Sequence, residues 1–390
     1  MKQKLAILIL LLLCIIVGFF SPSSAVAEES GQPISPDELL SALDYSSLVE
    51  YFNGLPDENK ALLGGSVEEF LSRSVSGENT ISLSNLFECL GESIKSSVIK
   101  FLPMTATVIA LLICFSLLSG INGELFSKPM EEVVSLGGVL TVSVYVLCQA
   151  YYLISSISTF SERISQLSES VFPILLTIIS SIGAKTTVGL YSSTVGIFLN
   201  VIVSLITNVV IPAAIISLVI SIVSSISNVV KLDNTGKFVS DFATGLVRTL
   251  FFSFFAFLSV QGIVVNVSDS ISMRLSKFAL SKYVPIIGGY LSDGFNYLIA
   301  GSIVIKNSIG LTAICLLFVE FLPLYFSIVL FNLSLKLTSA IAEPLNQNAV
   351  SNFLNKTVKG VSILGVAILG LFFSFVIFVS IIMIGSNVVA

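Results

Sequence analysis

Residues 283–310 decide how this chain is interpreted, and they read YVPIIGGYLSDGFNYLIAGSIVIKNSIG. The stretch is apolar enough to enter a membrane, yet Pro285, a glycine pair and several charged residues interrupt it. A plain membrane-spanning helix needs about 20 mostly apolar residues and avoids charge. Breakers at membrane depth are tolerated where the backbone is buried in protein or lines a watery cavity. Two interpretations follow: a broken or re-entrant segment beside a pathway, or an ordinary helix near residues 288–305.

The functionally sensitive residues predicted from this stretch combine backbone breakers with polar and charged groups. They are Pro285, Gly288, Asp293, Lys306, Asn307 and Gly310. Proline and glycine would shape a break, while Asp293 and Lys306 would pair or line a path. The next apolar segment adds Glu320, and an intramembrane carboxylate is a functional-site hypothesis by default. The structural alternative is that Glu320 is paired inside the bundle, with Lys306 as a candidate partner.

The composition is that of an integral membrane protein. Of 390 residues, 54% are hydrophobic and only 11% are charged, and the mean hydropathy is +0.99. Soluble domains carry about 25% charged residues. Long apolar runs separated by short loops are typical of helices rather than of barrel strands, which alternate. We therefore expect an all-α polytopic membrane bundle of six to eight spans. One or two of these segments could enter and leave the membrane on the same side, as re-entrant segments.

Three regions are predicted along the chain. Residues 1–27 are typical of a cleaved signal peptide, with two early lysines, an apolar core and an Ala-Val-Ala site before Glu28. Residues 28–100 form an acidic extracytoplasmic helical region with 13 acidic and 4 basic residues. Its second helix should begin at the Ser66 capping box. Residues 101–390 form the multi-span membrane domain.

Within the membrane domain, polar stretches are expected to separate the spans, and one of them, residues 155–170, is compatible with a helix. The expected apolar segments are 101–119, 133–154, a short or re-entrant 171–184, one or two spans within 190–230 with a break near Asn208 and Pro212, 246–267, 309–333 and 361–384. We expect residues 231–245 to be a loop and residues 268–284 to be a basic interfacial helix. Glycines 360, 365 and 370 should allow close helix contact.

Several function classes lack the residues that they need. The chain has no histidine, which excludes histidine-dependent zinc sites, haem–histidine ligation and Ser-His-Asp catalysis. Its five cysteines form no CxxC pair, and there is no P-loop, GxSxG or HExxH motif. The chain also lacks the basic stripe that is typical of nucleic-acid-binding proteins. We therefore expect no enzymatic activity, no cofactor and no metal site.

The central stretch also resembles a known family. A Pro-x-x-Gly-x-x-x-Ser/Thr-Asp segment followed by Lys-Asn-x-x-Gly, here Pro285 to Asp293 and Lys306 to Gly310, is similar to the stage III sporulation protein AE family. The resemblance extends over the whole layout, from signal peptide to C-terminal spans. It implies a polytopic protein of a secretion-like channel complex that links mother cell and forespore in endospore-forming bacteria, in the mother-cell (outer forespore) membrane.

The resemblance implies partners rather than chemistry. These are the other stage III sporulation A-operon membrane proteins, including ring-forming AG and AH and the ATPase AA, and stage II sporulation protein Q. The lipid bilayer is a further partner, and self-association into a homo-oligomer stays open. The residues alone leave two other functions open. One is a secondary transporter using Asp293, Lys306 and Glu320, and the other is a membrane anchor without a pore.

Overall fold

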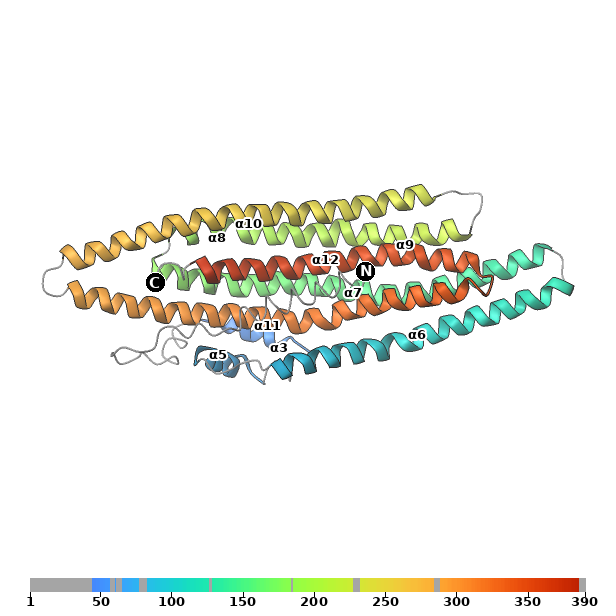
Figure 1. The fold of residues 1–390 in the computed structure, drawn as a ribbon, viewed down its shortest axis with the longest axis horizontal. Coiled ribbons are helices and arrows are strands. Elements are labelled where there is room, and N and C mark those ends of the chain that lie inside the picture. Colours follow the sequence, from blue (N-terminus) through green and yellow to red (C-terminus); the bar gives the residue numbers. More distant parts are fainter. Residues whose placement is uncertain are drawn as a thin grey trace.

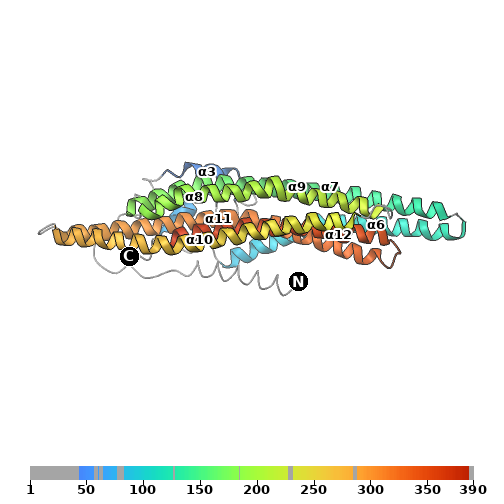
Figure 2. The same cartoon turned by 90° about the horizontal axis from the view of Figure 1, so that it is seen from above.

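Six long, nearly parallel helical segments form an elongated bundle (Figures 1 and 2). The structure is a computed structural model, and it describes residues 44–56, 60, 65–76, 83–125, 128–183, 185–226, 232–283 and 288–385. The predicted signal peptide and Pro285 lie outside these ranges. The long segments are α6 (Leu83–Leu125), α7 (Lys128–Ile182), the α8–η1–α9 segment (Lys185–Leu205, Ile206–Val210 and Ile211–Ile226), α10 (Asp233–Tyr283), α11 (Gly288–Ala342) and α12 (Asn348–Gly385).

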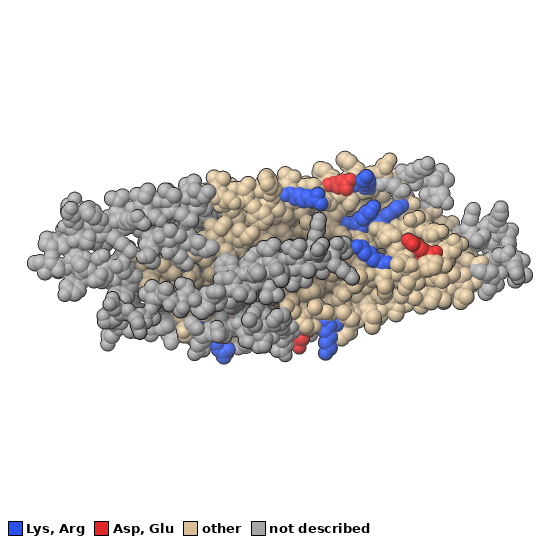
Figure 3. Space-filling model, viewed as in Figure 1, with Lys and Arg blue, Asp and Glu red and all other residues tan. Residues whose placement is uncertain are grey.

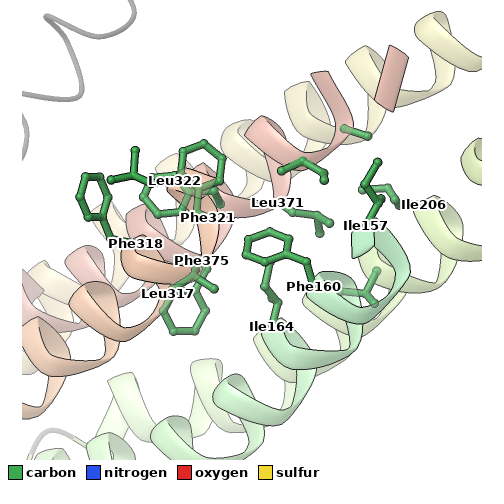
Figure 4. Close-up of a cluster of buried hydrophobic side chains, with 14 of the residues drawn as sticks. Ile157, Phe160, Ile164, Ile206, Leu317, Phe318, Phe321, Leu322, Leu371 and Phe375 are labelled. Atoms are coloured by element: carbon green, nitrogen blue, oxygen red, sulfur yellow. The ribbon is translucent and has the colours of Figure 1, made fainter. Parts of the chain in front are cut away.

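All six segments contain a stretch that is long and apolar enough to cross a membrane, so the predicted all-α polytopic bundle is confirmed. The two C-terminal helices, α11 and α12, form the centre. In their most apolar windows 61% and 67% of residues are buried, against 28–33% in the other four. Aromatic rings fill this centre: Phe321 stacks on Phe372 with centroids 4.1 Å apart. Figure 4 shows how α7, α11 and α12 contribute side chains to it.

Several predicted boundaries are wrong because polar stretches continue as helix. Residues 83–100 and 101–119 are one helix, α6, and residues 133–154, 155–170 and 171–182 are one helix, α7. The predicted loop 231–245 is helical from Asp233 onward, and α10 then runs unbroken to Tyr283. In residues 155–170, neighbouring helices bury Ile157, Phe160 and Ile164, so polarity on the other side of the helix does not require a loop.

The irregularity expected near Asn208 and Pro212 exists, but it is a π-helical turn rather than a break. Residues Ile206–Val210 form this wider turn directly before α9. Proline has no N–H and its ring clashes with the carbonyl four residues earlier, here that of Asn208. One inserted π turn relieves this clash without ending the helix. The chain therefore passes through residues 185–226 as a single spanning segment.

The described part of the N-terminal region, residues 44–56, 60 and 65–76, lies along the side of the bundle. It contains α3 (Ser46–Asn53) and α5 (Val67–Val75), which contact α7 and α11. The predicted capping box at Ser66 is confirmed, because its hydroxyl accepts a hydrogen bond of 3.1 Å from the Glu69 amide. Gly54 directly follows α3. This region is therefore folded onto the long helices.

Gly360, Gly365 and Gly370 of α12 each face a different helix. A side chain at Gly360 would meet Ser217 of α9, one at Gly365 would meet Ile328 of α11, and one at Gly370 would meet the ring of Phe251 of α10. The predicted close helix contact is thus confirmed at all three positions. The central helix α12 is held against three neighbours at three successive levels.

Candidate functional site

Glu320 of α11 lies at a junction of three elements. Its Oε1 atom is 3.2 Å from Nη1 of Arg163 on α7, and its Oε2 atom accepts a hydrogen bond of 3.1 Å from the hydroxyl of Tyr51 on α3. Arg163 also donates a hydrogen bond to the carbonyl of Gly54, just past α3. These four residues form the junction cluster. The cluster ties the N-terminal region to both α7 and α11.

Burial makes the junction cluster depend on its own pairing. Only 7% of the Glu320 side chain is exposed, and 24% of that of Arg163. A carboxylate removed from water is costly unless it is paired and hydrogen-bonded. Burial, followed by the negative charge of Glu320, raises the pKa of Tyr51 above its usual value, so the phenol stays protonated and donates. The Arg163 guanidinium lies 5.9 Å from the centre of the Tyr51 ring, which adds a cation–π contact.

Apolar packing continues the same junction along α11. Phe52, Val67 and Phe70 of the N-terminal region meet Thr312 and Leu316 of α11, and the space between them holds no room for water. The expectation that Glu320 is paired inside the bundle therefore holds, but the suggested partner is wrong. Glu320 pairs with Arg163, while Lys306 lies 14 residues earlier on the same helix, about 21 Å away along its axis.

Lys306 has a different contact, at the end of α12. The residue is completely buried, and its Nζ atom donates a hydrogen bond of 2.7 Å to the carbonyl of Met383. Met383 belongs to the last turn of α12, where backbone carbonyls lack partners inside the helix. A cation at a helix C-terminus is also favoured by the helix dipole. Lys306 therefore caps α12.

Gly310 lies one helical turn beyond Lys306 and contacts the same residue. A Cβ atom at Gly310 would be 2.6 Å from the Met383 sulfur and 3.2 Å from Val379. Positions four apart share one face of a helix. The Lys-x-x-x-Gly spacing of the motif thus forms a seat for the end of α12. Asn307, between them, has a buried amide oxygen that forms no hydrogen bond within the described part of the chain.

The remaining predicted residues are not brought to this seat. Gly288 begins α11, and Asp293 lies five residues later, but its side chain is outside the described part, as is Pro285. Between Gly288 and Gly310 the backbone is continuous helix, so the unbroken alternative is the one observed there. Asp293 and Lys306 are about 20 Å apart along one helix, which is too far for a direct ion pair. The predicted residues are thus spread along α11 and do not form one site.

Sequence reasoning missed Tyr51, Arg163 and Met383. A signal for the ion pair existed: Arg163 is the only basic residue between Lys128 and Lys185, and Glu320 the only acid between Asp293 and Glu343. Two isolated opposite charges in apolar surroundings need partners. Tyr51 and Met383 had no comparable signal. Among the described residues, no group of His, Cys, Asp and Glu could hold a metal ion.

Comparison with known proteins identifies the family. The family model for stage III sporulation protein AE matches residues 65–386, which is most of the chain and includes α5 and all six long segments. The chain belongs to the stage III sporulation protein AE family. The protein named stage III sporulation protein AE in Bacillus subtilis (strain 168) is 22% identical over 325 residues, which are 82% of this chain and 80% of that one. No solved structure matches significantly.

Family membership and structure together establish the coarse role. The chain is a sporulation protein whose six apolar helical segments indicate a multi-pass membrane protein. Both clusters described above lie inside the matched range, apart from Tyr51 and Gly54. The α11–α12 seat and the ion pair between α7 and α11 thus belong to the part shared with the family model.

Proposed function

We propose that this protein is a membrane component of a secretion-like channel complex that links mother cell and forespore during endospore development. The observation that carries the proposal is the family match across residues 65–386, together with six apolar helical segments. In this proposal the protein contributes its helices to the wall or base of the complex. Its role is assembly and support rather than catalysis of a reaction.

The proposed location is the mother-cell (outer forespore) membrane. Residues 1–27 would direct the N-terminal region to the space outside that membrane, after cleavage as a signal peptide. The proposed partners are the other stage III A-operon membrane proteins and, from the forespore side, stage II sporulation protein Q. The acidic N-terminal region, carried on α7 and α11, gives such partners an extracytoplasmic contact.

A passage through the centre of one chain is not part of the proposal. Phenylalanine rings fill the space between α11 and α12 (Figure 4), and Phe172 of α7 packs edge-on against Phe378 at 4.5 Å. A conduit would therefore form between this chain and its partners or further copies. The same filled centre also supports a second candidate function, which is that of a membrane anchor without a pore.

A secondary transporter is the weaker alternative. A transporter site gathers its charged groups near one level, at the midplane. Here Lys306 caps α12 while Glu320 belongs to the junction cluster, about 21 Å away along α11. The two groups that such a site would use are each committed to a separate structural contact.

The deciding experiment is affinity purification from sporulating cells that carry a tagged copy at the native locus. We expect the other stage III A proteins and stage II protein Q to co-purify, and deletion of the gene to prevent the formation of mature spores. A vegetative membrane protein of similar abundance, tagged in the same way, is the control. Purification without these partners, or normal sporulation of the deletion strain, would contradict the proposal. Solute flux through the purified protein alone, in vesicles, would establish the transporter instead.

A further inference from the structure

The exposed face of α7 changes character in the middle of the helix. In residues 133–152 the exposed side chains are Val133, Leu136, Leu140, Thr141, Val144, Cys148, Tyr151 and Tyr152. Thr141, the most polar of these, satisfies its hydroxyl on the Gly137 carbonyl of its own helix. In residues 155–180 the only exposed apolar side chain is that of Pro173. The other exposed residues are Ser155, Ser156, Thr159, Glu162, Gln166, Glu169, Thr177 and Ser180. One continuous helix therefore has an apolar exposed face in residues 133–152, called the outer half below, and a polar exposed face in residues 155–180, called the inner half.

The neighbouring helix α6 changes in the same way. Before the change the exposed side chains include the charged residues Glu92, Lys95 and Lys100 beside the apolar residues Ile94, Val98 and Ile99. Residues 101–119 carry no charge, and Leu102, Ile113, Leu117 and Leu118 are exposed there. This independent helix thus also has a part with exposed charges followed by an uncharged part. The turn between α6 and α7 follows the uncharged part of α6 and precedes that of α7.

The two changes occur at the same level of the bundle. A Cβ atom at Gly138 of α7 would be 3.2 Å from the Phe115 ring of α6, which fixes the register of this antiparallel pair. Leu102 lies 13 residues before Phe115, and Tyr151 lies 13 residues after Gly138. Equal steps in opposite chain directions bring Leu102 and Tyr151 opposite one another. A single plane therefore separates the polar from the apolar parts of both helices.

The apolar part has the length of a bilayer crossing. The apolar parts, residues 102–119 and 133–152, contain 18 and 20 residues, or about 27–30 Å of helix, and the hydrocarbon core of a bilayer is about 30 Å thick. Tyr151 and Tyr152 stand at the dividing plane with rings 6.0 Å apart and well exposed. Exposed tyrosine is typical of the membrane–water interface.

Charged residues beyond the plane exclude hydrocarbon there. Arg163 lies 12 residues past Tyr151, about 18 Å along α7, and it holds the N-terminal region through Gly54 and Glu320. This region exposes Asp44, Glu50, Glu68, Glu69 and Arg73. Exposed charges on an amphipathic region of this kind do not lie in lipid. The inner half of α7 and the N-terminal region thus share an aqueous environment.

We propose that lipid acyl chains contact only the outer half of the α6–α7 hairpin, residues 102–119 and 133–152, with the bilayer surface at Tyr151 and Tyr152. Helix α7 then crosses the bilayer once, and residues 155–182 are an extramembrane strut that carries the N-terminal region. The apolar stretches of α7 are consequently one span and one buried packing face, although together they are long enough for two spans.

The lipid contact is one-sided. At the level of the outer hairpin, α12 exposes Asn348, Asn352, Asn355 and Lys359. Its first turn lies there because Ser116 of α6 donates a hydrogen bond of 3.2 Å to the carbonyl of Leu345, in the turn before α12. Figure 3 shows basic and acidic side chains gathered on the face where α10 and α12 lie. This polar face is opposite in character to the α6–α7 face, and water or protein covers it.

Site-directed spin labelling of the full-length protein tests the proposal. The native cysteines are replaced, Cys315 by alanine because it is buried, and the protein is reconstituted in vesicles of phosphatidylethanolamine and phosphatidylglycerol. Nitroxides are attached at L140C and V144C in the outer half of α7 and at Q166C and E169C in the inner half. K95C and L117C form the matched pair on α6. Accessibility to oxygen reports lipid, and accessibility to a water-soluble nickel chelate reports water.

We expect a severalfold higher ratio of oxygen to nickel accessibility at positions 140, 144 and 117 than at positions 166, 169 and 95. Equal, high ratios in both halves of α7 would overturn the proposal, since lipid would then surround both. Low accessibility to both reagents at positions 166 and 169 would also overturn it, since protein would then cover the strut. Retention of the native circular dichroism and elution volume in each variant ensures that the readout belongs to the folded protein.

Discussion

Arg163 of α7 and Glu320 of α11 form an ion pair, with Nη1 and Oε1 3.2 Å apart. Both charges are largely buried, and each is the only charge of its sign in a long apolar surrounding. The pair therefore has no substitute partner when one member is removed. Through Tyr51 and Gly54 it also links the N-terminal region to the bundle.

Replacing Glu320 by glutamine should loosen the N-terminal region. Glutamine keeps the shape but leaves Arg163 without its counter-charge, which we expect to cost about 2 kcal/mol, below the range for fully buried pairs because Arg163 is partly exposed. Hydrogen exchange at residues 48–54 should then be about thirtyfold faster. The double variant R163M/E320Q should recover part of the loss, because no unpaired charge remains. Unchanged exchange in E320Q would refute the role of the pair; E162Q, at an exposed neighbouring acid, is the control.

Replacing Gly310 by leucine should separate the ends of α11 and α12. The new side chain would overlap Met383 and Val379, and overpacking of this kind costs about 1–3 kcal/mol. Alanine at the same position should be close to neutral, because its single methyl group displaces the flexible Met383 side chain, requires only a small shift of Val379, and gains about 1 kcal/mol in helix propensity. The double variant G310L/M383A should recover stability. Thermal unfolding of the purified protein in detergent measures all three, and a neutral G310L would contradict the seat.

The fold class was predictable because low charge and long apolar runs leave few alternatives to a helical bundle. Helix ends were not, since polarity alone does not distinguish a loop from a helix with one buried side. Residues 155–170 are the clearest case: Ile157, Phe160 and Ile164 are buried while Thr159 and Glu162 are exposed. Their spacing is helical, but the neighbour that covers them is known only from the tertiary structure.

The candidate site was predictable in part for the same reason. Lys306, Gly310 and Glu320 were recognised as unusual residues, and each has a specific tertiary contact. Their partners Met383 and Tyr51 are ordinary residues far away in the chain, so nothing local marks them. The motif spacing Lys-x-x-x-Gly has a structural explanation in the seat for α12. Whether the motif also serves a pathway stays a prediction.

Replacing Asn307 by leucine separates stability from function. The buried amide oxygen of Asn307 has no hydrogen-bond partner in the described part of the chain, and such a group costs about 1–3 kcal/mol. An apolar residue of similar size should therefore raise the free energy of unfolding by about 1 kcal/mol. If sporulation falls while stability rises, Asn307 contacts a partner in the assembled complex. A fall in stability would show that the amide is satisfied within the chain.

A lysine introduced on the exposed face of α7 should lower the amount of protein in the membrane when it lies in the outer half and should be tolerated when it lies in the inner half. At Leu140, 11 residues inside the plane marked by Tyr151, a lysine would meet lipid and cost about 3 kcal/mol near the middle of the bilayer. We expect L140K to accumulate poorly in washed membranes, at a tenth or less of the normal amount. At Gln166, on the polar half of the same helix, a lysine would meet water and should be tolerated. Immunoblots of membranes from both strains, with L140A and Q166A as controls for the lost side chains, measure this difference. Equal loss of L140K and Q166K would place both halves of α7 in lipid, and normal levels of both would place neither half there.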